Sequence, residues 1–308
     1  MRVRSVRDDS SRAKGLSADR QTALRAQRLL GKMRKRRTDF QAMSTLVSDE
    51  QICAYQVDGA VFLPALLKDW VETISAGIER NIREPGPYAA ENLKPGESGR
   101  FFDDYCNWQR IPEFVEVVQK SPVAEAAAAL MLSKSAQIFH DHVLVKEPGT
   151  AKATPWHQDA PYYFVDGDQT VSFWVPVDPV RDATLRCVGG SHRWPKLVLP
   201  VRWLSDENFY ADSDAYIPVP DPDAAPEKYR VLEWQMQPGD AVAFHYRTLH
   251  GARGNFTAER RRAFSLRFVG DDAVYATRPG RTSPPFPDHD MRPGQRLRED
   301  WFPVVWWQ

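Results

Sequence analysis

The spacing of apolar residues predicts helices in the first half of the chain and short strands in the second. Trp70, Ile74, Ile78 and Ile82 recur every four residues, which places them on one face of a helix over residues 66–83. Further helices are expected where other start signals and apolar runs occur, at residues 48–58, 113–119 and 122–132. The first of these begins with a capping box, in which a serine is followed three residues later by a glutamine.

After residue 135 the chain changes to short apolar segments with long connections between them. Strands are predicted at residues 137–146, 170–177, 231–236, 241–244 and 263–269. Because the strands follow the helices instead of alternating with them, a parallel βαβ sheet is not favoured. We expect a mainly β fold with helices (α+β). Its core would be a jelly-roll or cupin-type barrel, on which helices from the N-terminal half pack.

Three regions are expected along the chain. Residues 1–44 are basic and are predicted to be a flexible extension, whereas residues 45–277 form one domain. Residues 278–308 are rich in Pro and Trp and end in the apolar run Trp301 to Trp307. Such a terminus is expected to dock on the domain or on a partner subunit, which leaves a homodimer through this tail open.

Charge, hydropathy and cysteine content argue against a nucleic-acid-binding, membrane-spanning or disulfide-bonded protein. Residues 1–40 carry 13 Lys and Arg against 4 Asp, a net charge of +9, and the remainder carries −9. An acidic body argues against a nucleic-acid groove, so the expected partner is a small molecule. No apolar run reaches the roughly 18–20 residues of a membrane span. Cys53, Cys106 and Cys187 are far apart, which indicates reduced thiols in a cytoplasmic protein.

The segment Pro155-Trp156-His157-Gln158-Asp159 carries the first candidate chemistry. In an extended chain, side chains two apart leave the same face, so the imidazole of His157 and the carboxylate of Asp159 would converge. They supply two of the three ligands of a facial triad for non-haem Fe(II).

His250 is the best candidate for the third ligand, because it lies at the rim of an apolar strand that follows a Pro-Gly-Asp turn. His245 competes for this role, although its position within the strand favours packing. The same three donors would also suit catalytic zinc.

The run Arg260-Arg261-Arg262 offers an anion-binding group. On a strand, Arg261 shares a face with Ala263 and Ser265, and its two neighbours take the other face. An inward guanidinium can form a bidentate pair of hydrogen bonds with a carboxylate. A run of surface charges is the alternative, and the position relative to His250 favours a buried Arg261.

Several stretches resemble the phytanoyl-CoA dioxygenase family of Fe(II)/2-oxoglutarate oxygenases. They are "SDEQICAYQVDGAVFLPALL", "TPWHQDAPYY", "FWVPVDP", "GGSHR", "PGDAVAFHYRTLHGARGN" and "RRRAFSLRFVGDD", and the resemblance covers about residues 46–275. It implies a double-stranded β-helix that binds Fe(II) through His157, Asp159 and His250, with 2-oxoglutarate as cosubstrate and O₂ as oxidant.

The resemblance also implies the cosubstrate site. The arginine that pairs with 2-oxoglutarate falls eleven residues after the distal histidine, which is Arg261. A tryptophan near the cosubstrate matches Trp174, and two inward positions before the metal motif match His142 and Lys146. Many members of the family have Asn where this chain has Lys146.

The expected function is an Fe(II)/2-oxoglutarate-dependent dioxygenase that hydroxylates an unactivated C–H bond of a small organic or acyl substrate, with release of succinate and CO₂. Halogenases of the superfamily have a small residue in place of the carboxylate, so Asp159 favours hydroxylation. Two alternatives stay open. One is a zinc- or manganese-dependent hydrolase on a cupin-like barrel, and the other is a non-catalytic binding protein of the same fold.

Overall fold

The structure is a computed structural model that describes residues 46–205, 207–211 and 214–308. The predicted basic extension, residues 1–44, lies outside the described residues. In the described part no helix is long and apolar enough to cross a membrane.

Four α-helices occupy the first half of the described chain. They are α2 (Asp49–Asp58), α3 (Val71–Arg83), α4 (Pro112–Lys120) and α5 (Val123–Met131). The Oγ of Ser48 accepts a hydrogen bond from the N–H of Gln51, whose side chain accepts one from Ser48 in return, so the predicted capping box starts α2. Gly59 ends this helix in the left-handed conformation, at φ 73°, which glycine adopts without a steric penalty.

The predicted helix over residues 66–83 is divided in two. A short 3₁₀ turn, η1 (Lys68–Trp70), precedes α3. Ile74 and Ile78 are fully buried on the inner face of α3, as the four-residue spacing predicts. Trp70 caps the helix and is half-buried.

An eight-stranded sheet forms the centre of the described chain, in the order β1-β12-β7-β14-β4-β3-β2, with β16 also paired to β4. Its strands are β1 (Ala60–Leu63), β2 (Ala90–Glu91), β3 (Phe101–Tyr105), β4 (Ser135–Lys146), β7 (Thr170–Pro176), β12 (Ala241–Phe244), β14 (Arg261–Val269) and β16 (Val304–Trp307). The long central pairs are antiparallel, so residues directly opposite each other point to the same face.

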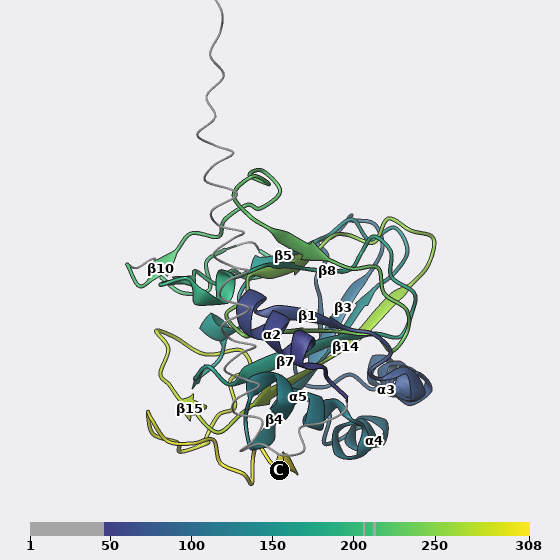
Figure 1. Cartoon of the computed structure of the whole chain (residues 1–308). Helices are drawn as coiled ribbons and strands as arrows, with labels where there is room; N and C mark the ends of the chain where they lie inside the picture. The colour runs from purple at the N-terminus through teal and green to yellow at the C-terminus, as the bar shows by residue number, and fades with distance from the viewer. Residues whose placement is uncertain (1–45, 206, 212–213) are drawn as a thin grey trace, which may run out of the picture. The chain divides into compact units, whose positions relative to one another are not determined.

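A four-stranded sheet, in the order β11-β8-β13-β5, faces the large one. Its strands are β5 (Thr154–His157), β8 (Leu185–Val188), β11 (Val231–Glu233) and β13 (His250–Ala252). Two small pairs complete the set: β9 (Leu197–Val198) with β10 (Tyr216–Ile217), and β6 (Val165–Asp166) with β15 (Val274–Tyr275). Figure 1 shows β5 and β8 together, apart from β4, β7 and β14.

The helices cover the large sheet. α2 packs on β1, α3 on β14, and α5 on β4 and β7, and Figure 1 shows this group of helices gathered around the same sheet. Two sheets face to face with helices outside the larger one are the expected α+β jelly-roll architecture, so the predicted fold class is confirmed.

One predicted strand is shorter than the pattern indicated. The segment 231–236 pairs with β8 only as far as Glu233. Its last residue, Met236, forms an isolated bridge to Val180 instead, because the chain bends away from the small sheet before the turn at residues 237–240.

Candidate functional site

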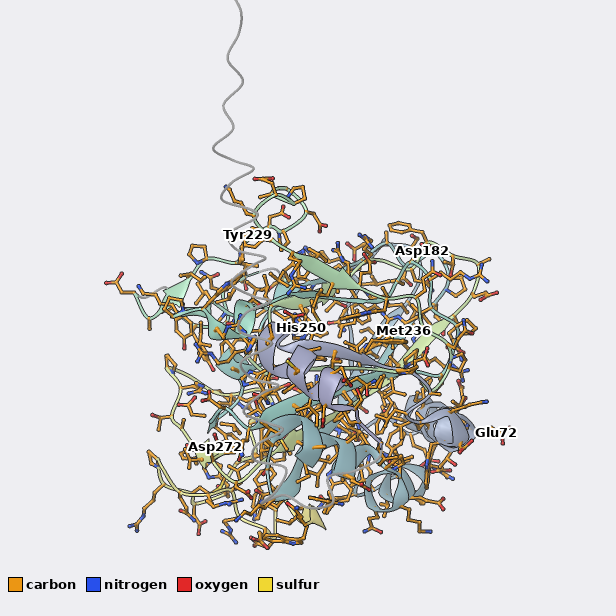
Figure 2. The ribbon with its side chains drawn as sticks, viewed as in Figure 1. Glu72, Asp182, Tyr229, Met236, His250 and Asp272 are labelled. Atoms are coloured by element: carbon orange, nitrogen blue, oxygen red, sulfur yellow. The ribbon has the colours of Figure 1, made fainter. Side chains whose placement is uncertain are left out.

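The two candidate histidines meet because their strands are neighbours. His157 is the last residue of β5 and His250 is the first of β13, and the two are directly opposite each other in the antiparallel pair. Asp159 follows two residues after the end of β5. One ligand atom from each of the three residues lies within 4.8 Å of the others, and all three residues are buried. Figure 2 shows His250 in the interior, between the strands.

Backbone carbonyls fix the orientation of both imidazoles. The Nδ1 of His157 is 2.8 Å from the carbonyl oxygen of Pro155, and the Nδ1 of His250 is 2.9 Å from that of Thr248. A carbonyl can only accept, so each Nδ1 carries the hydrogen and each Nε2 keeps its lone pair. Both Nε2 atoms lie 3.7 Å from Oδ1 of Asp159.

The second carboxylate oxygen of Asp159 contacts two side chains of the large sheet. Its Oδ2 accepts a hydrogen bond of 2.9 Å from Ser172 on β7 and lies 3.6 Å from Nε of Arg267 on β14. Burial raises the pKa of Asp159, but Arg267 and the two histidines outweigh burial and hold that pKa below its usual value. The carboxylate is therefore ionised.

The histidines have the complementary charge state. Burial, followed by the neighbouring His250, lowers the pKa of His157 to about 3. Burial also lowers the pKa of His250. Two neutral imidazoles and one carboxylate are the forms that bind a metal ion, and this donor set suits non-haem Fe(II). Within the described residues it is the one group of three or more such side chains close enough to hold a metal.

Arg261 lies on the inner face of β14 and is 4% exposed. It lines a small cavity together with His157, His250 and Trp174. Its guanidinium carbon is 5.4 Å from the centre of the Trp174 ring, and its Nε and Nη2 have no hydrogen-bond partner in the described structure. Burial lowers the pKa of Arg261 to about 10, so the group stays charged at neutral pH and lacks an anion.

The two neighbouring arginines point the other way. Arg260 pairs with Glu79 and Glu147, and Arg262 pairs with Glu79 and Asp178. The alternation along the strand thus separates one buried cation from two that are neutralised on the outside.

Lys146 lies opposite Arg261 on β4 and is fully buried. Its ammonium donates a hydrogen bond of 3.1 Å to the carbonyl of Arg253 and lies 4.5 Å from the centre of the Phe101 ring. Burial, followed by the charge of Arg261, lowers the pKa of Lys146 well below its usual value. Lys146 therefore adds a buried amine beside Arg261.

His142 takes a different position from Lys146, four residues earlier on β4. Its Nε2 is 2.7 Å from Oδ2 of Asp103, and its Nδ1 is 3.5 Å from Nη2 of Arg267. It faces a large cavity of about 470 Å³, which also reaches His157 and Asp159. The structure thus places His142 beside the triad and away from Arg261.

The large cavity contains side chains that the sequence did not single out. Aromatic rings among them form much of its wall: Tyr88, Tyr105, Trp203 and Phe209. Arg267 and Asp103 supply charge. The sequence did indicate a buried position for Arg267, because this residue lies six positions after Arg261 and so shares its strand face. Trp203 comes from an irregular segment that has no periodic pattern.

Comparison with known proteins gives one family. Residues 55–263 match the sequence profile described as "Phytanoyl-CoA dioxygenase (PhyH)". A curated protein of Caenorhabditis elegans, described as "Probable phytanoyl-CoA dioxygenase", is 29% identical over 175 residues, which are 55% of this chain and 51% of the relative. The match thus spans about half the length of that relative.

Several solved structures share the fold. The 2-oxoglutarate-dependent carbocyclase SnoK from nogalamycin biosynthesis is 23% identical, with a TM-score of 0.65 over 84% of this chain and 97% of that one. The epimerase SnoN, in complex with Fe³⁺, α-ketoglutarate and nogalamycin RO, is 20% identical, with a TM-score of 0.67 over 84% and 98%. EctD from S. alaskensis, with 2-oxoglutarate and 5-hydroxyectoine, is 17% identical, with a TM-score of 0.60 over 87% and 86%.

Proposed function

The chain belongs to the phytanoyl-CoA dioxygenase family of Fe(II)- and 2-oxoglutarate-dependent oxygenases, and from this premise we propose that it hydroxylates an unactivated C–H bond of a small organic or acyl substrate. Succinate and CO₂ are the coproducts. The observation that carries the proposal is the convergence of His157, Asp159 and His250 next to a buried arginine that has no anion.

The residues present fit both groups that the family uses. His157 and His250 would bind Fe(II) through their free Nε2 atoms, and Asp159 through Oδ1. Arg261 would pair with the distal carboxylate of 2-oxoglutarate, since its unpartnered nitrogens can donate to both carboxylate oxygens. Trp174 would cover one side of this carboxylate, and the proposed role of Lys146 is to place a buried amine beside Arg261.

When bound, Fe(II) and 2-oxoglutarate would together supply the oxidising power, with the cosubstrate as the source of two electrons for O₂. The protein side chains position the metal and the substrate. His157, Asp159 and His250 would hold the ion, and three protein ligands would leave room for the cosubstrate and O₂. Ser172 and Arg267 hold the carboxylate of Asp159 in place. We propose that His142 orients the substrate, because it faces the large cavity beside the triad.

Trp203 lines both cavities, as do His157 and Arg267. The small cavity measures about 20 Å³, which is room for about one water molecule. A five-carbon dicarboxylate needs more space, so its entry requires side chains such as Trp203 to move. Trp203 lies in a long connection between strands, where such movement costs less than within a sheet.

The test is succinate release from 2-oxoglutarate by the purified protein with Fe(II), ascorbate and a metabolite extract, with mass spectrometry of the products. A product that is one oxygen atom heavier supports hydroxylation. His157→Ala is expected to lower succinate release at least about 1,000-fold, since one of three metal ligands is lost. The exposed Glu72 on α3 (Figure 2) gives the control Glu72→Gln, which should retain full activity.

Other outcomes separate the alternatives. Hydrolysis with zinc or manganese and no 2-oxoglutarate would support a hydrolase, whereas failure to bind both Fe(II) and 2-oxoglutarate would support a binding protein. Turnover of 2-oxoglutarate with products of another mass would contradict hydroxylation but would leave the oxygenase assignment standing.

We also propose the class of substrate, the location and the division of the chain. The substrate would be a small molecule, in keeping with the size of the cavity. A cytoplasmic location is supported by three cysteines that form no disulfide. The division into an extension over residues 1–44, a catalytic domain over 45–277 and a tail over 278–308 is also a proposal. A homodimer through this tail stays a prediction, which the exposure of Trp307 supports.

A further inference from the structure

We infer, building on the proposed function, that the large cavity takes a compact monoanionic substrate whose carboxylate pairs with Arg267. The observations that support it are the contacts of Arg267, the charges around the cavity, and the cavity's size and wall.

Arg267 is a buried cation beside the metal centre. It lies on the inner face of β14, is 5% exposed, and lines the large cavity. Its Nε donates a hydrogen bond of 2.6 Å to the hydroxyl of Tyr163, and its Nη2 is 3.5 Å from Nδ1 of His142. Its Nη1 has no partner in the described part of the chain. A buried guanidinium with an unused donor is costly unless a ligand completes it.

The carboxylates near Arg267 are committed to other groups. Asp159 lies 3.6 Å away and is the one carboxylate in ion-pair range among the described residues, but it would also serve the metal. Asp103, which also lines the cavity, accepts from Asn92 at 2.5 Å and pairs with His142 at 2.7 Å.

A further positive charge stands at the rim, where Arg202 lies over the ring of Phe209 at 4.9 Å. With Fe(II) and 2-oxoglutarate bound, the formal charges across the two cavities would be five positive, on Fe(II), Arg202, Arg261 and Arg267, against four negative, on 2-oxoglutarate, Asp103 and Asp159. An anionic substrate would restore the balance.

The volume and the lining of the large cavity limit what the rest of the substrate can be. A volume of about 470 Å³ holds about 15 non-hydrogen atoms, if each takes the roughly 30 Å³ of a water molecule. This suits a compact acid with a ring-sized apolar body, which the aromatic wall would pack against. A thioester that carries a nucleotide would have to leave most of its atoms outside.

The test uses anaerobic calorimetry on the protein loaded with Fe(II) and saturating 2-oxoglutarate. The probes are benzoate, 3-phenylpropionate and indole-3-acetate, each compared with its neutral primary amide. At least one acid is expected to bind about 10- to 100-fold more tightly than its amide, because the amide forfeits a charge-assisted hydrogen bond to Arg267. Arg267→Gln should abolish this preference, and Arg267→Lys should restore part of it.

The control is Arg260→Gln, on the outer face of the same strand, which should keep the full preference. The absorbance band of the anaerobic Fe(II)–2-oxoglutarate complex shows, without any probe, whether each variant still assembles the metal centre. If the band forms and no acid is preferred over its amide in the unaltered protein, the substrate inference is wrong and the proposed function stands. The inference also fails if Arg267→Gln keeps the preference, or if palmitoyl-CoA binds more tightly than every acid. Absence of the band in the unaltered protein would contradict the proposed function itself.

Discussion

Arg261 shows how much depends on which face of a strand a residue occupies. Three consecutive arginines have the same chemistry, yet one is buried without an anion and its neighbours bind surface carboxylates. The alternation of side chains along β14 is sufficient to explain the difference.

A substitution at this position tests the cosubstrate site. Arg261→Met is expected to raise the KM for 2-oxoglutarate about 100-fold, because a buried carboxylate would lose its charged partner. Steady-state succinate release at varied 2-oxoglutarate measures the effect. Arg260→Met, on the outer face, is the matched control and should change the KM less than about twofold. Equal KM values for the two variants would contradict the assignment of Arg261.

The candidate metal-binding residues could be anticipated from sequence because a short spacing keeps two of them close together. His157 and Asp159 are two apart, and the structure brings His250 within reach of both. Asp103 and Trp203 could not be anticipated. Asp103 lies in a strand whose sequence Phe-Phe-Asp-Asp-Tyr breaks the apolar pattern, and its burial depends on partners distant in sequence.

Asp141 allows a prediction of how stability depends on pH. Burial raises the pKa of this carboxyl to about 7, although its Oδ1 accepts the N–H groups of Asn107 and Trp108. Its Oδ2 has no partner among the described residues. Because the folded pKa exceeds the unfolded one, the folded state holds the extra proton. Stability is therefore lost as pH rises from about 4 to about 7.

Asp141→Asn keeps the accepting oxygen and removes the titration. Relative to the unaltered protein, the free energy of unfolding of the variant is expected to rise by about 2–4 kcal/mol between pH 4 and pH 7, and to level off above that. Urea unfolding at several pH values measures this difference. A difference that is independent of pH would show that Asp141 is ionised in the folded protein across the whole range.

At the scale of whole elements, strands with continuous apolar sequence could be predicted and the irregular pieces could not. The segments predicted at 137–146 and 263–269 correspond to β4 and β14, which extend two residues further at their N-terminal ends. Both strands are buried over nearly their whole length, so their sequences carry the signal. The bend that shortens β11 depends on the distant Val180, which no local pattern contains.

The C-terminal segment shows how a terminal strand is held. β16 pairs with β4, and the side-chain amide of Gln137 donates to the carbonyls of Leu297 and Phe302. The ring of Phe302 is fully buried, 5.5 Å from that of Phe139. The segment is therefore anchored by strand pairing, by the hydrogen bonds from Gln137 and by buried side chains, of which Phe302 is the largest.

Two substitutions compare the anchor with the exposed end of this strand. Phe302→Ala is expected to cost about 3–5 kcal/mol, because it leaves a cavity in an aromatic cluster. Trp307→Ala, at a position that is 63% exposed, is expected to cost less than about 0.5 kcal/mol. Guanidinium unfolding of both variants measures the effects. Equal losses would mean that Trp307 is covered in solution, as a dimer through the tail would require.

At the scale of the whole described unit, the candidate metal centre lies between the two sheets and draws residues from both. The small sheet supplies His157 and His250, whereas Ser172 and Arg267 of the large sheet hold Asp159. His157 and Asp159 are two residues apart, whereas His250 comes from a distant segment, so all three meet only in the folded chain. An ion that binds all three therefore binds the folded state and not the unfolded one.

This arrangement predicts the effect of metal on thermal unfolding. Mn(II), which occupies Fe(II) sites without turnover, is expected at 100 times its Kd to stabilise the fold by about 2.7 kcal/mol, a rise in Tm of about 5–10 °C. Scanning calorimetry with and without the ion measures the shift. Asp159→Asn should lose most of it, since an amide is a poorer ligand than a carboxylate, and Glu72→Gln should keep it. An equal shift in all three proteins would place the ion elsewhere on the surface. No shift with either Mn(II) or Fe(II) would show that the triad does not hold a metal.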